Sequence, residues 1–149
     1  MPEPARAARS PLQFPNSELR ACNLAMAAPR HFPASAHFSG LIGGTHNGAI
    51  GFWTDGELAS LGVKQMAEWG SKSALQGEVA AAIIAGTAGE VISGGGVGMS
   101  PGQVETSFTI QPEYPLVTLT TMIAPSPDWF TGVTGLSLVV GSQWVPELV

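Results

Sequence analysis

Cysteine, charge and long apolar runs are all scarce in this sequence of 149 residues. Cys22 is the only cysteine, so no disulfide can form within the chain. A membrane-spanning helix needs roughly 18 or more consecutive apolar residues, and no such run is present. These two shortages predict a domain that folds around its own hydrophobic core and carries no transmembrane helix.

Positive charge is also sparse, and it is unevenly placed. Charged residues make up 11% of the chain, and its net charge is −5. Residues 1–30 hold four arginines and two glutamates and sum to +2, whereas residues 31–149 hold two lysines and nine acids and sum to −7. Phosphate binding needs clustered Lys and Arg, so we expect no nucleic-acid partner. An acidic body is compatible with cation binding.

Glycine and proline are plentiful, with 19 and 12 residues respectively. This balance favours a loop-rich β protein over a helical bundle. The length corresponds to one domain with an ordinary core.

Residues 1–29 show no apolar period of two or of 3.6, and they mix proline, arginine and alanine. We therefore expect a disordered or non-native segment. The apolar run Ala21–Ala28 is short, and the arginines, prolines and Glu18 before it make a poor signal peptide.

The rest of the chain alternates between strand and helix patterns. Residues 36–48, rich in glycine, predict a loop or irregular strand, and Gly94–Gly98 predicts a loop. Val104–Ile110 alternates apolar and polar residues, which is typical of a half-buried strand. Helical spacing predicts two helices, Leu58–Trp69 and Ser73–Ala85. The other expected strands are Ala49–Trp53, Leu116–Ile123 (in a hairpin with Val104–Ile110), Val133–Val140 and Gln143–Val145. Together these elements predict an antiparallel β-sandwich with a helical insertion at about 58–86.

A hydrolase is one alternative function. Gly98-Met99-Ser100-Pro101-Gly102 matches the nucleophile-elbow pattern of serine hydrolases. The elbow needs the N–H of the residue after the nucleophile, which Pro101 lacks, and all three histidines precede Ser100 in the chain. We interpret the motif as a glycine-rich turn.

A histidine-based metal site is a second alternative. His37 and His46 could bind a transition metal with Asp55, but their spacing fits no standard zinc motif. We favour hydrogen bonding to the backbone within a loop.

The most informative segment is Met122–Phe130, which leads from an expected strand into the turn Pro125-Ser126-Pro127-Asp128. Two prolines two residues apart fix φ near −65° and stiffen the turn. The turn presents Asp128 beside Trp129 and Phe130. A carboxylate on a rigid loop suits a hard cation such as Ca²⁺, although one carboxylate is not a site.

This segment also carries a family resemblance. Pro125–Val133 resembles the signature of the spondin N-terminal domain, which is found in F-spondin-type matrix proteins and in secreted bacterial proteins. Three further segments match in the family's order, namely Ala36–Asn47, Phe52–Trp53 and Ala59–Gly70. The resemblance runs from about Arg30 to Val149 and defines the expected domain as 30–149.

The resemblance implies a β-sandwich similar to calcium-dependent lipid-binding domains. It implies a secreted, non-enzymatic adhesion module with an extracellular matrix or cell-surface partner, protein or glycan, and by fold analogy a lipid surface. It also implies that Asp128 is a Ca²⁺ ligand. The family's other carboxylates come from a segment beyond Val149, so we expect a vestigial or partial calcium site and a C-terminally incomplete domain.

Two further expectations concern exposure. Most of the large aromatic side chains, including those of Trp69 and Trp129, are expected in the core, and Phe130 is the one candidate for exposure. If the sandwich is incomplete, it should leave an unpaired strand edge.

Overall fold

The structure is a computed structural model, which describes residues 20–28, 35–141 and 143–145. The described residues form two helices and nine strands. The helices are α1 (Leu61–Trp69) and α2 (Ser73–Ile84). The strands are β1 (Arg20–Ala28), β2 (His37–Phe38), β3 (Ile42–His46), β4 (Ala88–Ser93), β5 (Gly102–Ile110), β6 (Leu116–Ala124), β7 (Phe130–Ser137), β8 (Val139–Val140) and β9 (Gln143–Trp144). None of the helices in these ranges is long and apolar enough to cross a membrane.

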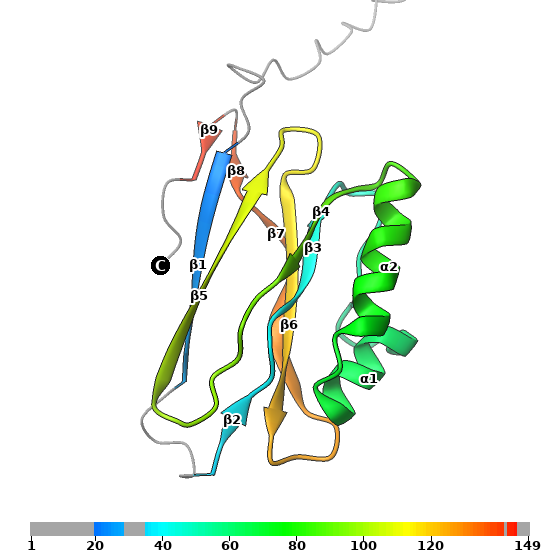
Figure 1. The fold of residues 1–149 in the computed structure, drawn as a ribbon. Coiled ribbons are helices and arrows are strands. Elements are labelled where there is room, and N and C mark those ends of the chain that lie inside the picture. The colour runs from blue at the N-terminus through cyan, green and yellow to red at the C-terminus, as the bar shows by residue number, and fades with distance from the viewer. Residues whose placement is uncertain (1–19, 29–34, 142, 146–149) are drawn as a thin grey trace, which may run out of the picture.

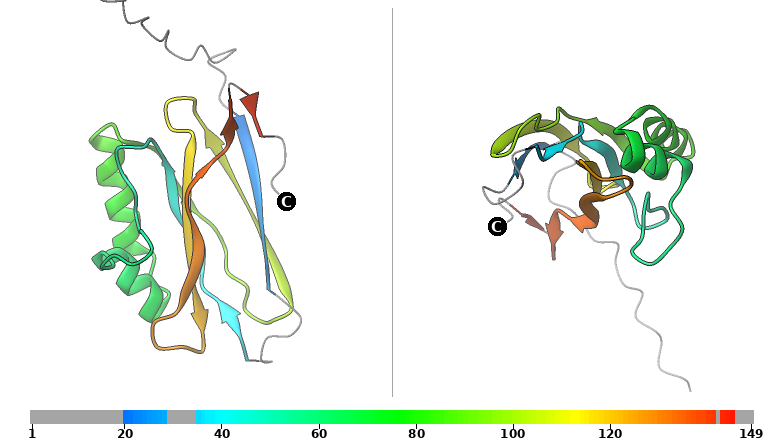
Figure 2. Two further views of the ribbon diagram at one scale, coloured as in Figure 1. Left: turned by 180° about the vertical axis from the view of Figure 1, so that it is seen from behind. Right: turned by 90° about the horizontal axis from the view of Figure 1, so that it is seen from below.

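A five-stranded antiparallel sheet forms the middle of the molecule (Figure 1). Its strand β6 pairs with β3 and β2 on one side and with β7 on the other, and β3 also pairs with β4. The two helices cover one face of this sheet, and the β1–β5 ribbon lies on the other side, as the end view shows (Figure 2). The expectation of a mainly β, antiparallel fold with a helical insertion is confirmed. The likeness to calcium-dependent lipid-binding domains stays a prediction.

Strand β6 is buried on both of its faces, because a separate core packs against each. Val117 and Leu119 join Phe108 and Ile110 of β5 in the core between the sheets. On the opposite face, Met122 packs against the core that the helices form, whose buried members are Ile42, Phe52, Val63, Met66, Ala67, Leu75, Val79, Ala82 and Ala88. The alternation of side chains along a strand thus serves two cores at once.

The boundaries of α1 follow from capping. The Ser60 hydroxyl accepts a hydrogen bond from the Val63 N–H, and the Glu78 carboxylate of α2 accepts from the Gly62 N–H. Gly70 ends α1 with a φ of 66°, a left-handed conformation that glycine adopts without strain. Both predicted helices are confirmed, with α1 beginning at Leu61 instead of Leu58 and α2 ending one residue early.

The first strand corrects the expectation for residues 1–29. Residues 20–28 form β1, which pairs with β5 along nine positions, from Arg20 opposite Ile110 to Ala28 opposite Gly102. An apolar segment without its own periodicity becomes a strand because β5 supplies a ladder of backbone hydrogen bonds. The expectation of disorder was wrong for these nine residues, and residues 1–19 lie outside the described ranges.

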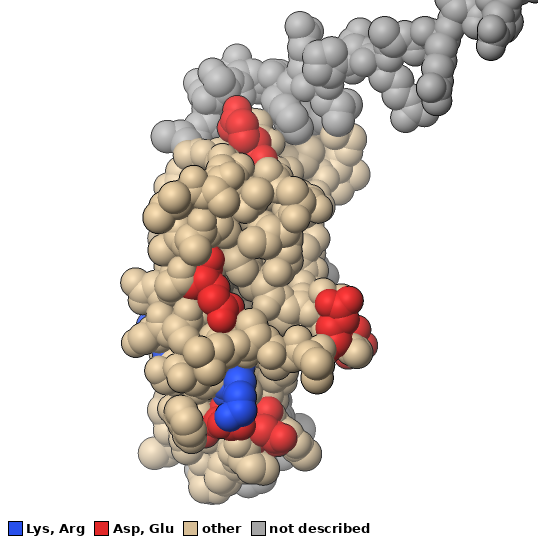
Figure 3. All heavy atoms as spheres, turned by 90° about the vertical axis from the view of Figure 1, so that its right-hand side faces the viewer, with Lys and Arg blue, Asp and Glu red and all other residues tan. Residues whose placement is uncertain are grey.

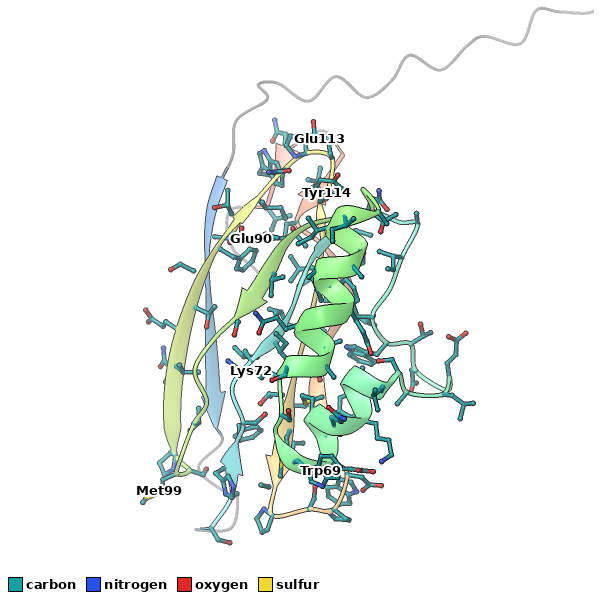
Figure 4. All side chains as sticks on the ribbon, turned by 45° about the vertical axis from the view of Figure 1, so that its right-hand side comes forward. Trp69, Lys72, Glu90, Met99, Glu113 and Tyr114 are labelled. Carbon is teal, nitrogen blue, oxygen red and sulfur yellow. The ribbon has the colours of Figure 1, made fainter. Side chains whose placement is uncertain are left out.

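The expected hairpin between the next two strands was also wrong. Strand β5 (predicted as Val104–Ile110) and strand β6 (predicted as Leu116–Ile123) belong to different sheets, so the turn between them connects two sheets. Strands β4 and β5 lie side by side, and the Glu90 carboxylate of β4 accepts a hydrogen bond of 2.8 Å from the Thr109 N–H of β5 (Figure 4). A side chain thereby satisfies a strand N–H that has no ladder partner on this side.

Two other strand assignments differ from the sequence expectation. Ala49–Trp53 forms no strand, although Phe52 is buried and packs among the helices. Strand β4 was not foreseen, and it follows α2 directly.

Close approach in the central sheet depends on two glycines of β3. A Cβ atom on Gly43 would overlap the Thr118 carbonyl oxygen of β6, and one on Gly44 would lie 2.6 Å from a methyl group of Val79 in α2. The missing side chains therefore let β3 fit between β6 and α2.

Candidate interaction site at the β6–β7 loop

The loop between β6 and β7 is organised by one serine side chain. The Ser126 hydroxyl donates to the Ile123 carbonyl at 2.6 Å and accepts from the Trp129 N–H at 2.9 Å. The Ile123 N–H donates to the Trp129 carbonyl at 2.8 Å and closes the loop. These bonds fix the direction in which the loop presents its tip, as the two prolines predicted.

The two aromatic residues of the loop exchange their expected roles. Trp129, expected in the core, is 67% exposed. Phe130, expected to be exposed, is partly buried and packs edge-on against Trp53, with ring centroids 5.4 Å apart. The backbone at Trp129 is tied to Ser126 and Ile123, which leaves Phe130 as the first β7 side chain directed at the core.

A second exposed tryptophan lies at the same end of the molecule. Trp69, the last residue of α1, is 68% exposed, which corrects its expected core position (Figure 4). The next residue, Gly70, is close to Met122 of β6, since a Cβ atom on Gly70 would lie 3.5 Å from the Met122 sulfur. We call Trp69 and Trp129 the tryptophan end.

Both positively and negatively charged side chains lie at this end. The Lys64 ammonium lies 5.7 Å from the centre of the Trp69 ring and 2.8 Å from the Glu68 carboxylate. Across the helix side of the surface, acidic side chains are scattered and little positive charge is visible (Figure 3). A cation–π contact orients the indole of Trp69 while leaving most of its surface exposed.

Asp128 lies exposed at the tip of the loop, next to Trp129. Ca²⁺ in proteins takes about 6–8 oxygen ligands, several of them carboxylates. Within the described ranges, no group of three or more His, Cys, Asp or Glu residues is placed to hold a metal ion. The described residues therefore do not supply a complete calcium site, and among them Asp128 is a single exposed carboxylate on this loop.

The described histidines serve the structure. The Nδ1–H of His46 donates to the Asn47 carbonyl at 2.8 Å, and in the neutral ring Nε2 accepts from the Thr118 hydroxyl at 2.7 Å. The Thr118 oxygen also accepts from the Gly135 N–H at 2.9 Å, so the network joins β3, β6 and β7. The exposed His37 donates to the Ser35 carbonyl, and Asp55 lies in an exposed turn. His31 lies outside the described ranges.

Ser100 lacks the surroundings of a nucleophile elbow. That motif places its serine at a sharp turn from a strand into a helix. Here Ser100 is buried, its N–H donates to the Ala36 carbonyl, and the segment leads into strand β5. The interpretation as a turn agrees with this position.

The fold is a mainly β domain with two helices and an aromatic, loop-borne surface. Comparison with known proteins gives its family. The Spondin_N family model matches residues 23–149. Spondin-2 of Rattus norvegicus is 32% identical over 133 residues, which cover 83% of this chain and 38% of that protein. Spondin-2 of Homo sapiens is 34% identical over 122 residues, covering 79% and 37%, and Spondin-1 of Xenopus laevis is 33% identical over 132 residues, covering 83% and 16%.

The chain belongs to the spondin N-terminal domain family. The matched part is less than two fifths of the length of Spondin-2 and about one sixth of that of Spondin-1. The family match begins at residue 23, inside β1, whereas the resemblance in the sequence was expected to begin at about Arg30.

Proposed function

We propose that this domain is a non-enzymatic extracellular adhesion module that binds a matrix or cell-surface protein or glycan through the tryptophan end. The observation that carries the proposal is the pair of exposed indoles, Trp69 at 68% and Trp129 at 67%. Tryptophan is enriched among the residues that dominate binding energy at protein interfaces. Membership of the spondin family supports the extracellular assignment. A lipid surface stays a prediction from fold analogy.

An ordered backbone at both tryptophans favours binding at this end. The Trp129 backbone is held by the Ser126 hydroxyl and the Ile123 N–H, and Trp69 is followed by the Gly70 cap. A surface whose backbone is already ordered loses less conformational entropy when it binds. The loop and the helix end therefore act as a preformed contact surface.

Removal of both indoles is expected to abolish most adhesion. The test compares the wild-type domain with a Trp69→Ser, Trp129→Ser variant on detergent-extracted matrix deposited by cultured fibroblasts. We expect a loss of at least about tenfold in retained protein, because each buried tryptophan at an interface contributes about 2 kcal/mol or more.

Ile84→Ser is the matched control, because Ile84 is 89% exposed at the end of α2. This variant should be retained like the wild type. Equal retention of the tryptophan variant, with an unchanged melting curve, would remove the tryptophan end from the proposal.

Asp128 is proposed as one ligand of a partial calcium site. A lone carboxylate should bind Ca²⁺ with a dissociation constant of about 10 mM or weaker, since complete extracellular sites reach 10⁻⁴–10⁻³ M. At 1 mM Ca²⁺ this adds only about 0.06 kcal/mol to the free energy of unfolding. The melting temperature in 1 mM Ca²⁺ is therefore expected to lie within about 1 °C of its value in EDTA.

Weak binding can still be assigned to Asp128. In a Ca²⁺ titration followed by NMR, the amide resonances of Asp128 and Trp129 should shift without saturating below about 10 mM, and Asp128→Asn should lose the shift. The absence of any shift in the wild type would eliminate the partial site. A rise of several degrees in melting temperature that Asp128→Asn abolishes would show that additional oxygen ligands complete it.

A further inference from the structure

Strand β7 presents a long unpaired edge. Among the described residues it pairs only with β6, so its other edge faces no strand. Its eight residues include no charged residue and no proline, and residues 131–135 are all exposed. Proteins usually protect such edges with charges, prolines, short strands or bulges, because an open edge pairs readily with another strand.

The protection that β7 does have lies at its far end. The register of β7 shifts against β6 between Val133 and Leu136, where Gly135 has a φ of 58°. This bulge twists the second half of the strand. The first half, Phe130–Val133, pairs with β6 in one unbroken register.

The direction of the backbone groups on this edge follows from the register. The Ile123 N–H donates to the Trp129 carbonyl, which makes residues 123 and 129 a hydrogen-bonded pair. Hydrogen-bonded and non-hydrogen-bonded pairs alternate along an antiparallel ladder. Thr131 and Val133 therefore direct their N–H and C=O groups toward β6, whereas Phe130 and Gly132 direct theirs outward.

We infer that a second copy of this chain docks on the β7 edge, strand against antiparallel strand, about a two-fold axis at Gly132. This inference is independent of the proposed adhesion function. An antiparallel edge is complementary to itself, so each Gly132 exchanges two hydrogen bonds with Gly132 of the second copy. Thr131 then faces Val133 of the second copy, a pair of β-branched residues that suits a sheet.

The absence of charge on β7 and the small area of one strand pair predict how this dimer forms and how tightly. Two neutral edges approach without like-charge repulsion, although the protein as a whole carries −5. One strand pair buries far less than the roughly 1,200 Å² of a stable interface, so the dimer is weak. We expect a dissociation constant on the order of 100 µM.

The primary test is sedimentation velocity of the wild-type chain over concentrations from roughly 10 µM to 1 mM, the range that brackets this constant. The variant Thr131→Lys, Val133→Lys places two like-charged pairs across the interface and should weaken the dimer about tenfold or more. The variant Thr131→Lys, Val133→Glu places opposite charges across the same pairs and should dimerise like the wild type. A third variant, Gln76→Lys, Ala81→Lys, adds the same two charges on exposed positions of α2 and should also dimerise normally.

A second measurement tests the register without any substitution. Amide hydrogen exchange followed by NMR should slow at Phe130 and Gly132 as the protein concentration rises, while Thr131 and Val133 remain protected throughout. A wild-type chain that stays monomeric over the whole range would overturn the inference. A dimer with no new protection at Phe130 and Gly132, or equal dimerisation by the two-lysine variant, would do the same by placing the interface elsewhere.

Discussion

Alanine at position 43 is expected to lower the free energy of unfolding by about 3 kcal/mol or more, the upper range for overpacking in a core. A Cβ atom on Gly43 would overlap the Thr118 carbonyl oxygen and lie 2.9 Å from the Leu119 Cα. Both neighbours are backbone atoms of the central strand β6, so no side chain can rotate away. Relief requires β3 and β6 to separate along part of their ladder.

Urea unfolding of Gly43→Ala followed by circular dichroism measures this effect. Gly48→Ala is the matched control, because a Cβ atom on Gly48 would meet nothing within 4 Å. The control should unfold within about 0.5 kcal/mol of the wild type, as ordinary surface substitutions do. An equally small effect at position 43 would show that β3 lies farther from β6 than the structure places it.

Valine at position 118 is expected to lower the free energy of unfolding by about 1–3 kcal/mol, although valine has nearly the shape of threonine. The Thr118 hydroxyl donates to Nε2 of the buried His46 at 2.7 Å and accepts from the N–H of the exposed Gly135 at 2.9 Å. Both groups would lose their partner, but only His46 is buried, and an unsatisfied buried polar group costs about 1–3 kcal/mol. The loss should be visible in the unfolding free energy and in faster amide exchange at Gly135.

Thr106, which lies on strand β5, offers the matching control. Its hydroxyl is buried and has no hydrogen-bond partner in the structure, so Thr106→Val removes a polar group that is already unsatisfied. We expect this variant to be neutral or more stable by about 1 kcal/mol. If both valine variants behave alike, the His46 network does not stabilise the sheet.

Features that depend on local chemistry could be read from the sequence. The helix that ends at Gly70 was predictable because its apolar spacing and its cap lie within a few residues. The burial of Thr106, Phe108 and Ile110 followed from simple alternation along one strand. The structural role of His46 also held, although its partner Thr118 was not foreseen.

Features that depend on distant partners could not be read in this way. Alternation predicts that a segment is a strand but does not specify which strand pairs with it, so β5 was assigned to β6 when its partner is β1. Similarly, the Phe130 ring is partly buried because it packs against Trp53, which lies on a loop far away in the sequence, and Trp129 is left exposed. The signal that could have been used is Ser126, whose position before an aromatic pair favours a hydroxyl-stabilised turn.

The pairing of β1 with β5 bears on how this chain folds. Arg20 pairs with Ile110, which lies 90 positions later in the sequence, so the ladder closes a very long loop. Closing such a loop has an entropic cost before any hydrogen bond forms, and contacts of this separation slow folding. Strand β1 leaves the ribosome before β5 and cannot dock until β5 has emerged. Strand β1 therefore stays without its partner while the residues between β1 and β5 are made.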